Sequence, residues 1–146
     1  MSADFSQLLT FQTNLTRLSD DLRQEFIEAC AKELAARLLN NVIKRTPVGQ
    51  YKDKVGGTLR RGWTAGKGAT QFCKELRVNH FGGTYVIEII NPVEYASYVE
   101  YGHRTRDHKG WVNGKFMLTI SENEIRADMP NILERKLTKK LKEVLQ

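Results

Sequence analysis

The side chains best suited to chemistry gather between Asn91 and Leu118. His103 and His108 are close in sequence and Asp107 precedes the second histidine, a set of groups that could hold a metal ion or move a proton. Histidine pairs that bind metal on a helix are usually four residues apart, and no third group of ligands is visible. The neighbouring side chains are cations, which would repel a metal ion. We therefore expect no metal site in this stretch.

Candidate nucleophiles and carboxylates do not form an active site either. Ser97 and Ser121 lack the strand–turn–helix context in which a serine becomes a nucleophile. Glu100 is expected to face Arg104 one helical turn further on, as an ion pair. The sequence therefore predicts a protein that is not an enzyme and that uses no cofactor, with a small hydrolase as the weakest alternative.

Positive charge is the second chemical feature of the chain. The formal net charge is +6, and the excess lies in residues 50–74, in residues 103–115 and near the C-terminus. Runs of charge usually cover a solvated face, but clustered cations also bind acidic partners or nucleic acid. A basic DNA- or RNA-binding module is therefore kept as an alternative function. The cations concerned are Lys52, Lys54, Arg60, Arg61, Lys67 and Lys74, then Arg104, Arg106, Lys109 and Lys115, and finally Arg135, Lys136, Lys139, Lys140 and Lys142.

Four aromatic residues accompany the second cationic stretch. Tyr95 and Tyr98 are expected to pack a short helix onto a sheet. Tyr101 and Trp111 flank the glycine-rich cationic residues, which predicts a loop that is anchored at both ends and mobile over 103–114. Because a buried tryptophan needs a partner for its polar tip, Trp111 is interpreted equally as an intramolecular anchor and as an interface residue.

A long amphipathic helix is the most clearly predicted element. Ser19 is a suitable N-cap for it, and Pro47 ends it, because the residue before a proline is pushed out of the helical conformation. Residues 49–57 are expected to form a loop. Cys30 and Cys73 lack metal-binding spacing and are interpreted as reduced thiols. The apolar stripe of the helix consists of Leu22, Phe26, Cys30, Leu34, Leu38 and Val42.

Three strands of a small antiparallel sheet are expected between residues 58 and 91. Residues 58–64 alternate with a period of two, residues 72–79 form a second strand, and residues 84–91 form a third. The Gly82-Gly83 pair is predicted to make the tight turn before the third strand. Both faces of 84–91 are apolar, so this strand is either central in the sheet or covered on its second face by a partner subunit.

The C-terminal third supplies two further helices. A short helix is expected over 94–101, followed by the cationic loop. The apolar segment from Phe116 is interpreted as the beginning of a helix, with a strand as the alternative. Pro130 is expected to break or kink this helix. Its apolar face contains Leu133, Leu137, Leu141 and Leu145. The predicted fold class is α+β: a long N-terminal amphipathic helix packed on a small antiparallel sheet, a short helix, a cationic loop and a C-terminal helix.

Length and composition match an ordinary globular protein. The 146 residues are expected to form a single domain, 1–146, which is long enough to bury a core. No apolar run is long enough to span a bilayer, so no membrane partner is expected. The N-terminal MSADFSQLL has neither the basic nor the apolar region of a signal peptide, which predicts a protein made and kept in a cytoplasm.

Four motifs follow one another along the chain. They are TPV at 46–48, GTLRRGW at 57–63, YASYVEYGH at 95–103 and GWVNGKFM at 110–117. In this order and at these spacings, over roughly residues 5–145, the chain resembles the tail-component family of HK97-like tailed phages. Gly62 stands where that family commonly has serine, Lys115 where it has arginine, and residues 49–56 exceed the usual short turn. The structural motif residues of the resemblance are Pro47, Gly57, Leu59, Trp63, Tyr95, Tyr98, Glu100, Tyr101 and Gly102.

The resemblance implies a non-enzymatic structural protein of a tailed phage or prophage. The implied role is tail completion or head–tail joining, performed by assembling with itself as a ring and with other neck and tail proteins. Transient contact with packaged DNA is also implied. The implied location is the neck or tail of the virion, with the host cytoplasm before assembly. The candidate assembly interface consists of His103, Arg104, Arg106, Lys109, Trp111 and Lys115.

Overall fold

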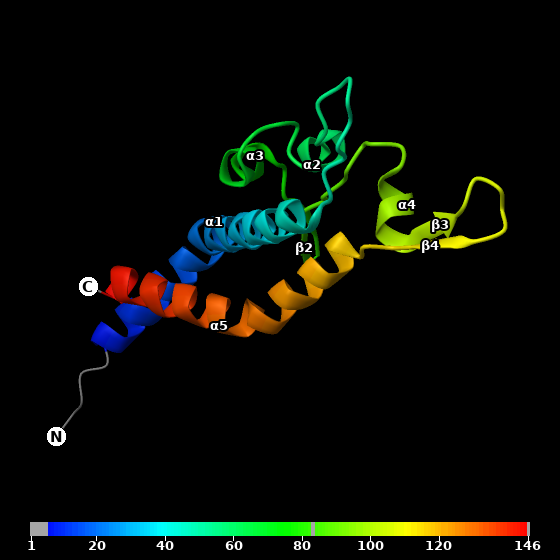
Figure 1. The fold of residues 1–146 in the computed structure, drawn as a ribbon. Coiled ribbons are helices and arrows are strands. Elements are labelled where there is room, and N and C mark those ends of the chain that lie inside the picture. Colours follow the sequence, from blue (N-terminus) through cyan, green and yellow to red (C-terminus); the bar gives the residue numbers. More distant parts are fainter. Residues whose placement is uncertain (1–5, 83, 146) are drawn as a thin grey trace.

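Two long helices, α1 (Ser6–Arg45) and α5 (Met117–Leu145), form the body of the protein. The computed structural model describes residues 6–82 and 84–145, and the side chains of 22–82 and 84–143. In Figure 1 the two helices lie against each other and run in opposite directions, so that α5 ends near the beginning of α1. The smaller elements sit along one side of this pair and beyond one of its ends.

The helix α1 is longer than the sequence indicated. It continues through Ser19, so the prediction that this residue caps the start of the helix is wrong; the side chain of Ser19 lies outside the described residues. Residues 6–18 contain neither glycine nor proline, so no backbone restriction stops the helix there. The helix ends at Arg45, which confirms the expected end before Pro47.

The core lies where α1, α5 and two short helices meet. Leu39 and Val42 of α1 and Met117 of α5 are completely buried. They pack with Leu59, Trp63 and Cys73 from α2 (Thr58–Gly62) and α3 (Ala69–Glu75). Leu34, in the middle of the predicted stripe, is only partly buried and lines a shallow apolar groove instead.

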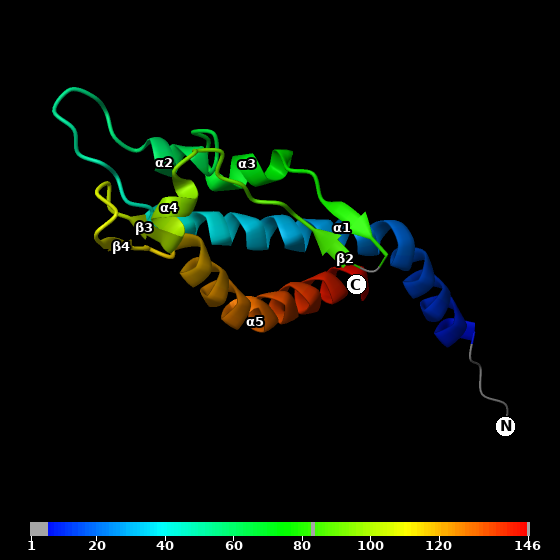
Figure 2. The same ribbon diagram turned by 90° about the vertical axis from the view of Figure 1, so that its right-hand side faces the viewer.

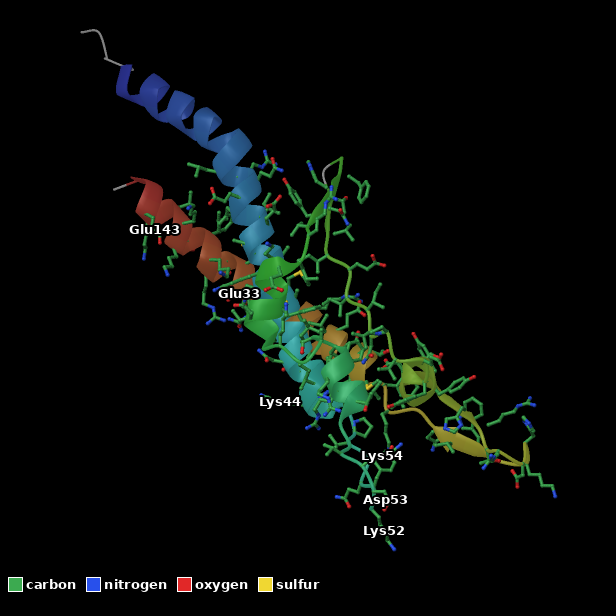
Figure 3. All side chains as sticks on the ribbon, turned by 90° about the horizontal axis from the view of Figure 1, so that it is seen from above. Glu33, Lys44, Lys52, Asp53, Lys54 and Glu143 are labelled. Atoms are coloured by element: carbon green, nitrogen blue, oxygen red, sulfur yellow. The ribbon has the colours of Figure 1, made fainter. Side chains whose placement is uncertain are left out.

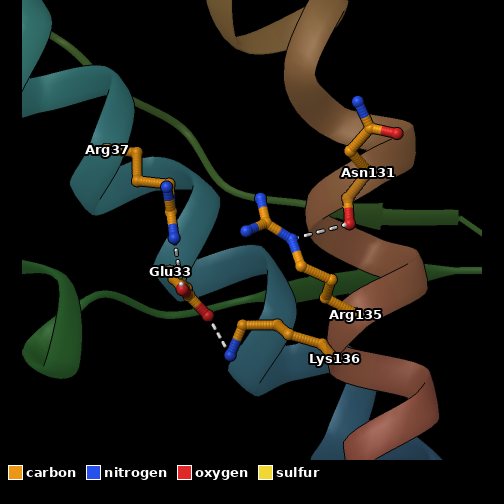
Figure 4. Close-up of polar contacts among 5 residues, drawn as sticks. All are labelled: Glu33, Arg37, Asn131, Arg135 and Lys136. Carbon is orange, nitrogen blue, oxygen red and sulfur yellow. Dashed lines mark hydrogen bonds and ion pairs between the residues drawn. The ribbon is translucent and has the colours of Figure 1, made fainter.

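Ion pairs also join the two long helices. Glu33 of α1 accepts a hydrogen bond from Arg37 Nη2 at 3.1 Å, one turn further along the helix. Its other carboxylate oxygen contacts Lys136 Nζ of α5, as Figure 4 shows. Arg45 of α1 pairs with Glu124 of α5 in the same way nearer the other end. Partly exposed pairs such as these contribute little stability individually.

Two of the three expected strands are largely helical. Residues 58–62 of the expected strand 58–64 form α2, because Leu59 and Trp63 are four residues apart and both reach the core from one helical face. The expected strand 72–79 is divided between α3 and a short strand, β1 (Asn79–Phe81), since Ala69 and Cys73 also share a helical face. A period of two over so few residues does not distinguish a strand from one helical turn.

The first hairpin pairs β1 with β2 (Thr84–Val86) in antiparallel register. His80 and Tyr85 are cross-strand partners, and their rings stack with centroids 4.4 Å apart. Gly82 has a φ of 58°, as expected of a tight turn, whereas Gly83 lies outside the described residues. The expected third strand therefore ends at Val86 and has a neighbour on one side only, so the prediction of a central strand over 84–91 is wrong.

The remaining elements form the end of the molecule opposite the beginning of α1 and the end of α5. The short helix is confirmed as α4 (Ala96–Tyr101). The cationic loop contains a second antiparallel hairpin, β3 (Gly102–Arg104) with β4 (Trp111–Asn113), which extends beyond the helices in Figure 1. Pro130 does not break α5, which continues through it and is bent midway in Figure 2.

The α+β class is confirmed, with a long N-terminal helix, small antiparallel sheets and a C-terminal helix. None of the described helices has both the length and the hydropathy that a bilayer crossing requires.

Candidate assembly interface

The turn after α1 is held by the side chain of Thr46. Its hydroxyl donates to the Val42 carbonyl at 2.7 Å and accepts from Trp63 Nε1 at 2.8 Å. The same oxygen lies 3.4 Å from Met117 Sδ. Because Thr46 and Trp63 are both buried, each polar group needs the other as its partner. Thr46 thus joins α1, α2 and the start of α5.

The residues around Trp63 tie the same turn to the middle of the chain. Arg60 donates two hydrogen bonds to the Thr46 carbonyl, at 2.7 and 3.2 Å. Asn91 Nδ2 donates to the Leu59 carbonyl at 2.8 Å. A Cβ atom at Gly62 would lie 2.3 Å from Asn91 Oδ1, so the side chain of Asn91 fills the space that a side chain at position 62 would need. The sequence marked Arg60 only as one of the cations of residues 50–74, and no local pattern pointed to the role of Asn91.

Glu100 fixes the beginning of α5. Its carboxylate is buried and accepts hydrogen bonds from the backbone N–H groups of Leu118 and Thr119, both at 2.9 Å. The Thr119 hydroxyl donates to it as well, at 2.7 Å. A carboxylate at a helix N-terminus satisfies orphan N–H groups and interacts favourably with the helix dipole. The expected ion pair with Arg104 is wrong, because the N-terminus of α5 lies within reach of Glu100 and supplies better donors.

Glycines let the base of the second hairpin cross α4 closely. Gly102 has a φ of 89°, and a Cβ atom there would lie 2.5 Å from the Val112 carbonyl oxygen. At Gly114 a Cβ atom would lie 2.3 Å from the Glu100 carbonyl oxygen. The backbone of Phe116 donates to that same carbonyl at 3.0 Å. The hairpin is therefore joined to the buried Glu100 by backbone contacts that larger residues would prevent.

The tip of the hairpin is ordered by its own polar groups. Asp107 accepts from the Thr105 hydroxyl at 2.5 Å and from the Lys109 N–H at 3.1 Å. These two donors hold the pKa of the Asp107 carboxyl below its usual range. The charged form, and the order it gives the tip, is therefore favoured at neutral pH and lost as the pH falls through that lowered pKa. The Gly110 N–H completes the turn by donating to Thr105 Oγ1 at 3.0 Å.

The structure brings five of the six residues of the candidate interface onto this one projection and places the sixth, Lys115, just after it. His103 and Arg104 lie on β3, Trp111 lies on β4 beside Arg104, and Arg106 and Lys109 lie in the tip. Lys115 lies in the short link that leads to α5. Within the described residues none of these four cations forms an ion pair. Asp107 is the acid nearest in sequence, and its carboxylate is already bound within the tip. We call residues 102–114 the cationic hairpin.

Aromatic side chains surround the cationic hairpin without being buried. Tyr98 and Tyr101 are 60% and 63% exposed, and Tyr95 is also exposed, so the expected packing of Tyr95 and Tyr98 on a sheet is wrong. Helix α4 turns Val99 towards the core instead, which leaves the tyrosines outside. Trp111 is 59% exposed and lies against Gly102. Its side chain therefore contacts the rest of the protein and is also accessible to a partner.

The other basic stretches differ from the cationic hairpin. In residues 50–74, Arg60 and Arg61 bond backbone carbonyls, and Lys67 pairs with Glu75 at 2.5 Å. Residues 47–57, which overlap the start of this stretch, form an arm. Figure 3 shows the arm extending from the body with Lys52, Asp53 and Lys54 at its outer end. In the C-terminal helix, Lys136 pairs with Glu33, while Lys139, Lys140 and Lys142 have no ion pair among the described residues.

Groups that could support catalysis or metal binding are dispersed. No group of three or more metal-binding side chains occurs in the described part of the chain. Cys30 and Cys73 are free thiols, as expected, and both are buried. Burial raises the pKa of each thiol, and a nearby lysine opposes this to a smaller degree. Neither thiol is therefore suited to act as a nucleophile.

Comparison with known proteins supplies one match. Residues 10–102 match the family described as "Bacteriophage HK97-gp10, putative tail-component". The match contains two of the four sequence motifs and all of the third except its last residue, His103, and it confirms the resemblance. It ends at Gly102, so the fourth motif and most of the cationic hairpin lie beyond it. Neither the curated proteins nor the solved structures include a significant match to this chain.

Proposed function

Because the chain belongs to the HK97-gp10-like family of bacteriophage tail components, we propose that it completes the tail or joins it to the head by assembling as a ring. Family membership makes it a structural component of the phage tail. The finer role, the ring and the absence of enzymatic activity are our proposals. In this account the chain acts by binding its neighbours and turns over no substrate.

The observation that carries the proposal is the cationic hairpin. It is an ordered projection whose arginines and lysines have no acidic partner among the described residues, and it presents a largely exposed tryptophan. Tryptophan and arginine are the residues most often found at the energetic centre of protein interfaces. The planar guanidinium of Arg104 or Arg106 also suits two-point contact with a carboxylate. The exposed tryptophan and the arginines without acidic partners therefore suit the hairpin to bind an acidic protein surface.

The buried motifs give this projection a rigid base. Thr46 and Trp63 join α1 to α2, and Glu100 joins α4 to α5, so the hairpin leaves the body at a defined angle. Among the motif residues, Leu59 is buried beside Trp63 in the core, and Gly102 lies against the backbone of Val112. We propose that these residues act structurally, by holding the interface in place, within a single domain that covers residues 1–146.

The proposed partners follow from the proposed role. They are further copies of this chain in a ring, together with other neck and tail proteins of the same phage. The proposed location is the neck or tail of the virion, reached from the host cytoplasm. A subunit in a closed ring must present two different surfaces to its two neighbours, and a projecting hairpin is suited to be one of them.

The test is the size of the assembled protein. Light scattering during size-exclusion chromatography should show an oligomer whose fraction rises with protein concentration. The double variant Arg104→Ala/Arg106→Ala should remain monomeric under the same conditions. A matched control, Lys139→Ala/Lys142→Ala, removes the same charge from α5 and should still assemble. A wild-type chain that stays monomeric at every concentration would refute the ring.

A nucleic-acid-binding module is the second candidate function. Its support is the set of unpaired cations on the hairpin and on the last turns of α5, which could contact phosphates. Phosphate binding weakens steeply with salt, because it releases condensed counterions. Tight DNA binding with a steep salt dependence, lost in the Arg104→Ala/Arg106→Ala variant while assembly persists, would place this function first.

A further inference from the structure

Unused backbone hydrogen-bonding groups lie directly after β2. Residues 87–90 continue from β2 outside any helix or strand, and within the described part of the chain their N–H and C=O groups make no hydrogen bond. Ile87 and Ile89 pack against the core whereas Glu88 and Ile90 are exposed, which is the alternation expected of a strand with one buried face. Such unpaired groups on an extended backbone are a template for another strand. We call residues 87–90 the open segment.

We propose that the open segment of one copy of this chain binds β4 of the next copy, so that neighbouring subunits share a β-sheet. The inference rests on the proposed ring and names the two surfaces that would form its contact. Addition of a strand to an exposed edge is a recurrent mode of protein recognition, in which main-chain hydrogen bonds supply affinity.

Strand β4 has the free edge that this pairing requires. One side of β4 is paired with β3, and β3 packs against α4. Apart from the bonds within the hairpin, the backbone of Trp111–Asn113 makes no hydrogen bond to the described residues. The side chains of Trp111 and Val112 are exposed. The strand is therefore preformed, accessible and apolar enough to bury surface on docking.

Charge and apolar side chains are complementary across the proposed contact. Glu88 and Glu94, in and just after the open segment, are exposed and form no ion pair with any described residue. They offer carboxylates to Arg104 and Arg106, which lack acidic partners. Ile90 is 60% exposed between the two glutamates and offers an apolar surface to Trp111. Complementary potentials favour one register and suppress wrong partners.

Within one copy the two surfaces lie apart. Figures 2 and 3 show the β1–β2 hairpin and the β3–β4 hairpin at different places along the molecule, with α4 between the open segment and β3. A contact between two different surfaces on successive copies is heterologous, and it closes into a ring when the rotation permits. The same contact therefore accounts for the free edge, the unpaired charges and the assembly.

Charge exchange tests the pairing. The variants Arg104→Glu/Arg106→Glu and Glu88→Arg/Glu94→Arg should each lower the fraction of assembled chain at least about tenfold at equal concentration, since like charges then face each other. The variant that carries all four changes should recover assembly, because the attraction is restored with reversed sign. Circular dichroism and melting temperature establish that each variant is folded. Four changes that fail to recover assembly, in folded protein, would overturn the inference.

Cross-linking gives a second and independent readout. A chain with Ile90→Cys and Val112→Cys, treated with a short bismaleimide, should form a ladder of covalent dimers and higher oligomers. The control pair Ile90→Cys with Val55→Cys, which uses the exposed arm, should not. The native Cys30 and Cys73 are buried and should not react.

The outcomes separate the inference from the proposed function. If wild-type protein forms rings but the Ile90→Cys/Val112→Cys chain gives no cross-linked oligomers, the shared β-sheet is overturned while the proposed ring stands. A cross-link that forms only within one copy would also overturn it. Wild-type protein that never assembles would remove the proposed function, and the shared sheet with it.

Discussion

At the scale of the residue, two buried side chains determine how the elements meet. Thr46 gives the indole of Trp63 its acceptor, and Glu100 gives the first N–H groups of α5 theirs. In both cases the partner is distant in sequence, and the group would be buried without a hydrogen bond if the partner were removed. Loss of a buried partner costs about 1–3 kcal/mol, which exceeds the value of a typical exposed contact.

Thr46→Val is predicted to destabilise the protein by about 1–3 kcal/mol, because it preserves shape but leaves Trp63 Nε1 without an acceptor. Thr46→Ser keeps the hydroxyl and should retain most of the stability. Urea unfolding followed by tryptophan fluorescence measures both variants. Equal stability of the valine and serine variants would show that the hydrogen bond is not important.

Both native thiols are predicted to be slow to react. Burial raises the pKa of Cys30 and of Cys73, so the thiolate fraction near neutral pH is below that of a free cysteine. Ellman's reagent should therefore detect almost no thiol in folded protein and both thiols in urea. Reaction of either thiol at the rate of free cysteine in native buffer would contradict the described packing.

At the scale of the element, a helix cap and two projections define the working end of the protein. Helix α5 begins where Glu100 binds it, and the cationic hairpin and the arm both extend beyond the end of the helix pair. The two projections differ in internal support. The hairpin has a ladder and a bonded tip, whereas Arg61 donates to the arm only at its last two residues, to the Gly56 carbonyl at 3.0 Å and to the Gly57 carbonyl at 2.9 Å.

Glu100→Ala is predicted to cost about 1–3 kcal/mol, because the Leu118 and Thr119 N–H groups lose their acceptor. Helix content by circular dichroism should fall slightly, since the first turn of α5 frays. Glu94→Ala removes an exposed carboxylate nearby and should change stability by less than about 0.5 kcal/mol. Equal effects from the two substitutions would refute the capping role of Glu100.

Trypsin is predicted to cut the arm first, at Lys52 or Lys54, and the hairpin second, at Arg106 or Lys109. The reason is that local opening is easiest where few backbone hydrogen bonds must break. Mass spectrometry of the early fragments gives the order. First cleavage within α1 between residues 25 and 45 would show that the arm and the hairpin are both docked, contrary to the structure.

The sequence predicted the long helices and the short helix α4, but it misassigned the short segment 58–64 and most of 72–79 as strands. The end of α1 before Pro47, the helix α4 and the C-terminal helix follow from local rules that neighbours do not override. Residues 58–64 do not, because the burial of Leu59 and Trp63 against α1 decides between one helical turn and a strand. The structure places Arg104, Arg106 and Lys109 on one hairpin, and their role there remains a prediction. The hydrogen bond from Thr105 to Asp107, which orders the tip, depends on a turn that no sequence pattern revealed.

At the scale of the whole molecule, a packed core carries exposed groups that could bind a partner. The described residues place the core between α1, α5 and the short helices, while the hairpin cations, the tyrosines of α4 and the open segment remain uncovered. A tail component that acts by assembly requires this division between a fixed core and unfilled surfaces. Surface charges of this kind affect folding little and association strongly.

The most direct measurement is the yield of infectious particles from the phage or prophage that encodes this chain, with the gene supplied in variant form. Arg104→Ala/Arg106→Ala is predicted to lower that yield by at least about two orders of magnitude while the melting temperature of the purified monomer stays nearly unchanged, since the exposed arginines contribute little to folding. Lys139→Ala/Lys142→Ala, with the same loss of charge outside the hairpin, should support a normal yield. Normal yield from the arginine variant would contradict the claim that this protein works by assembling through its cationic hairpin.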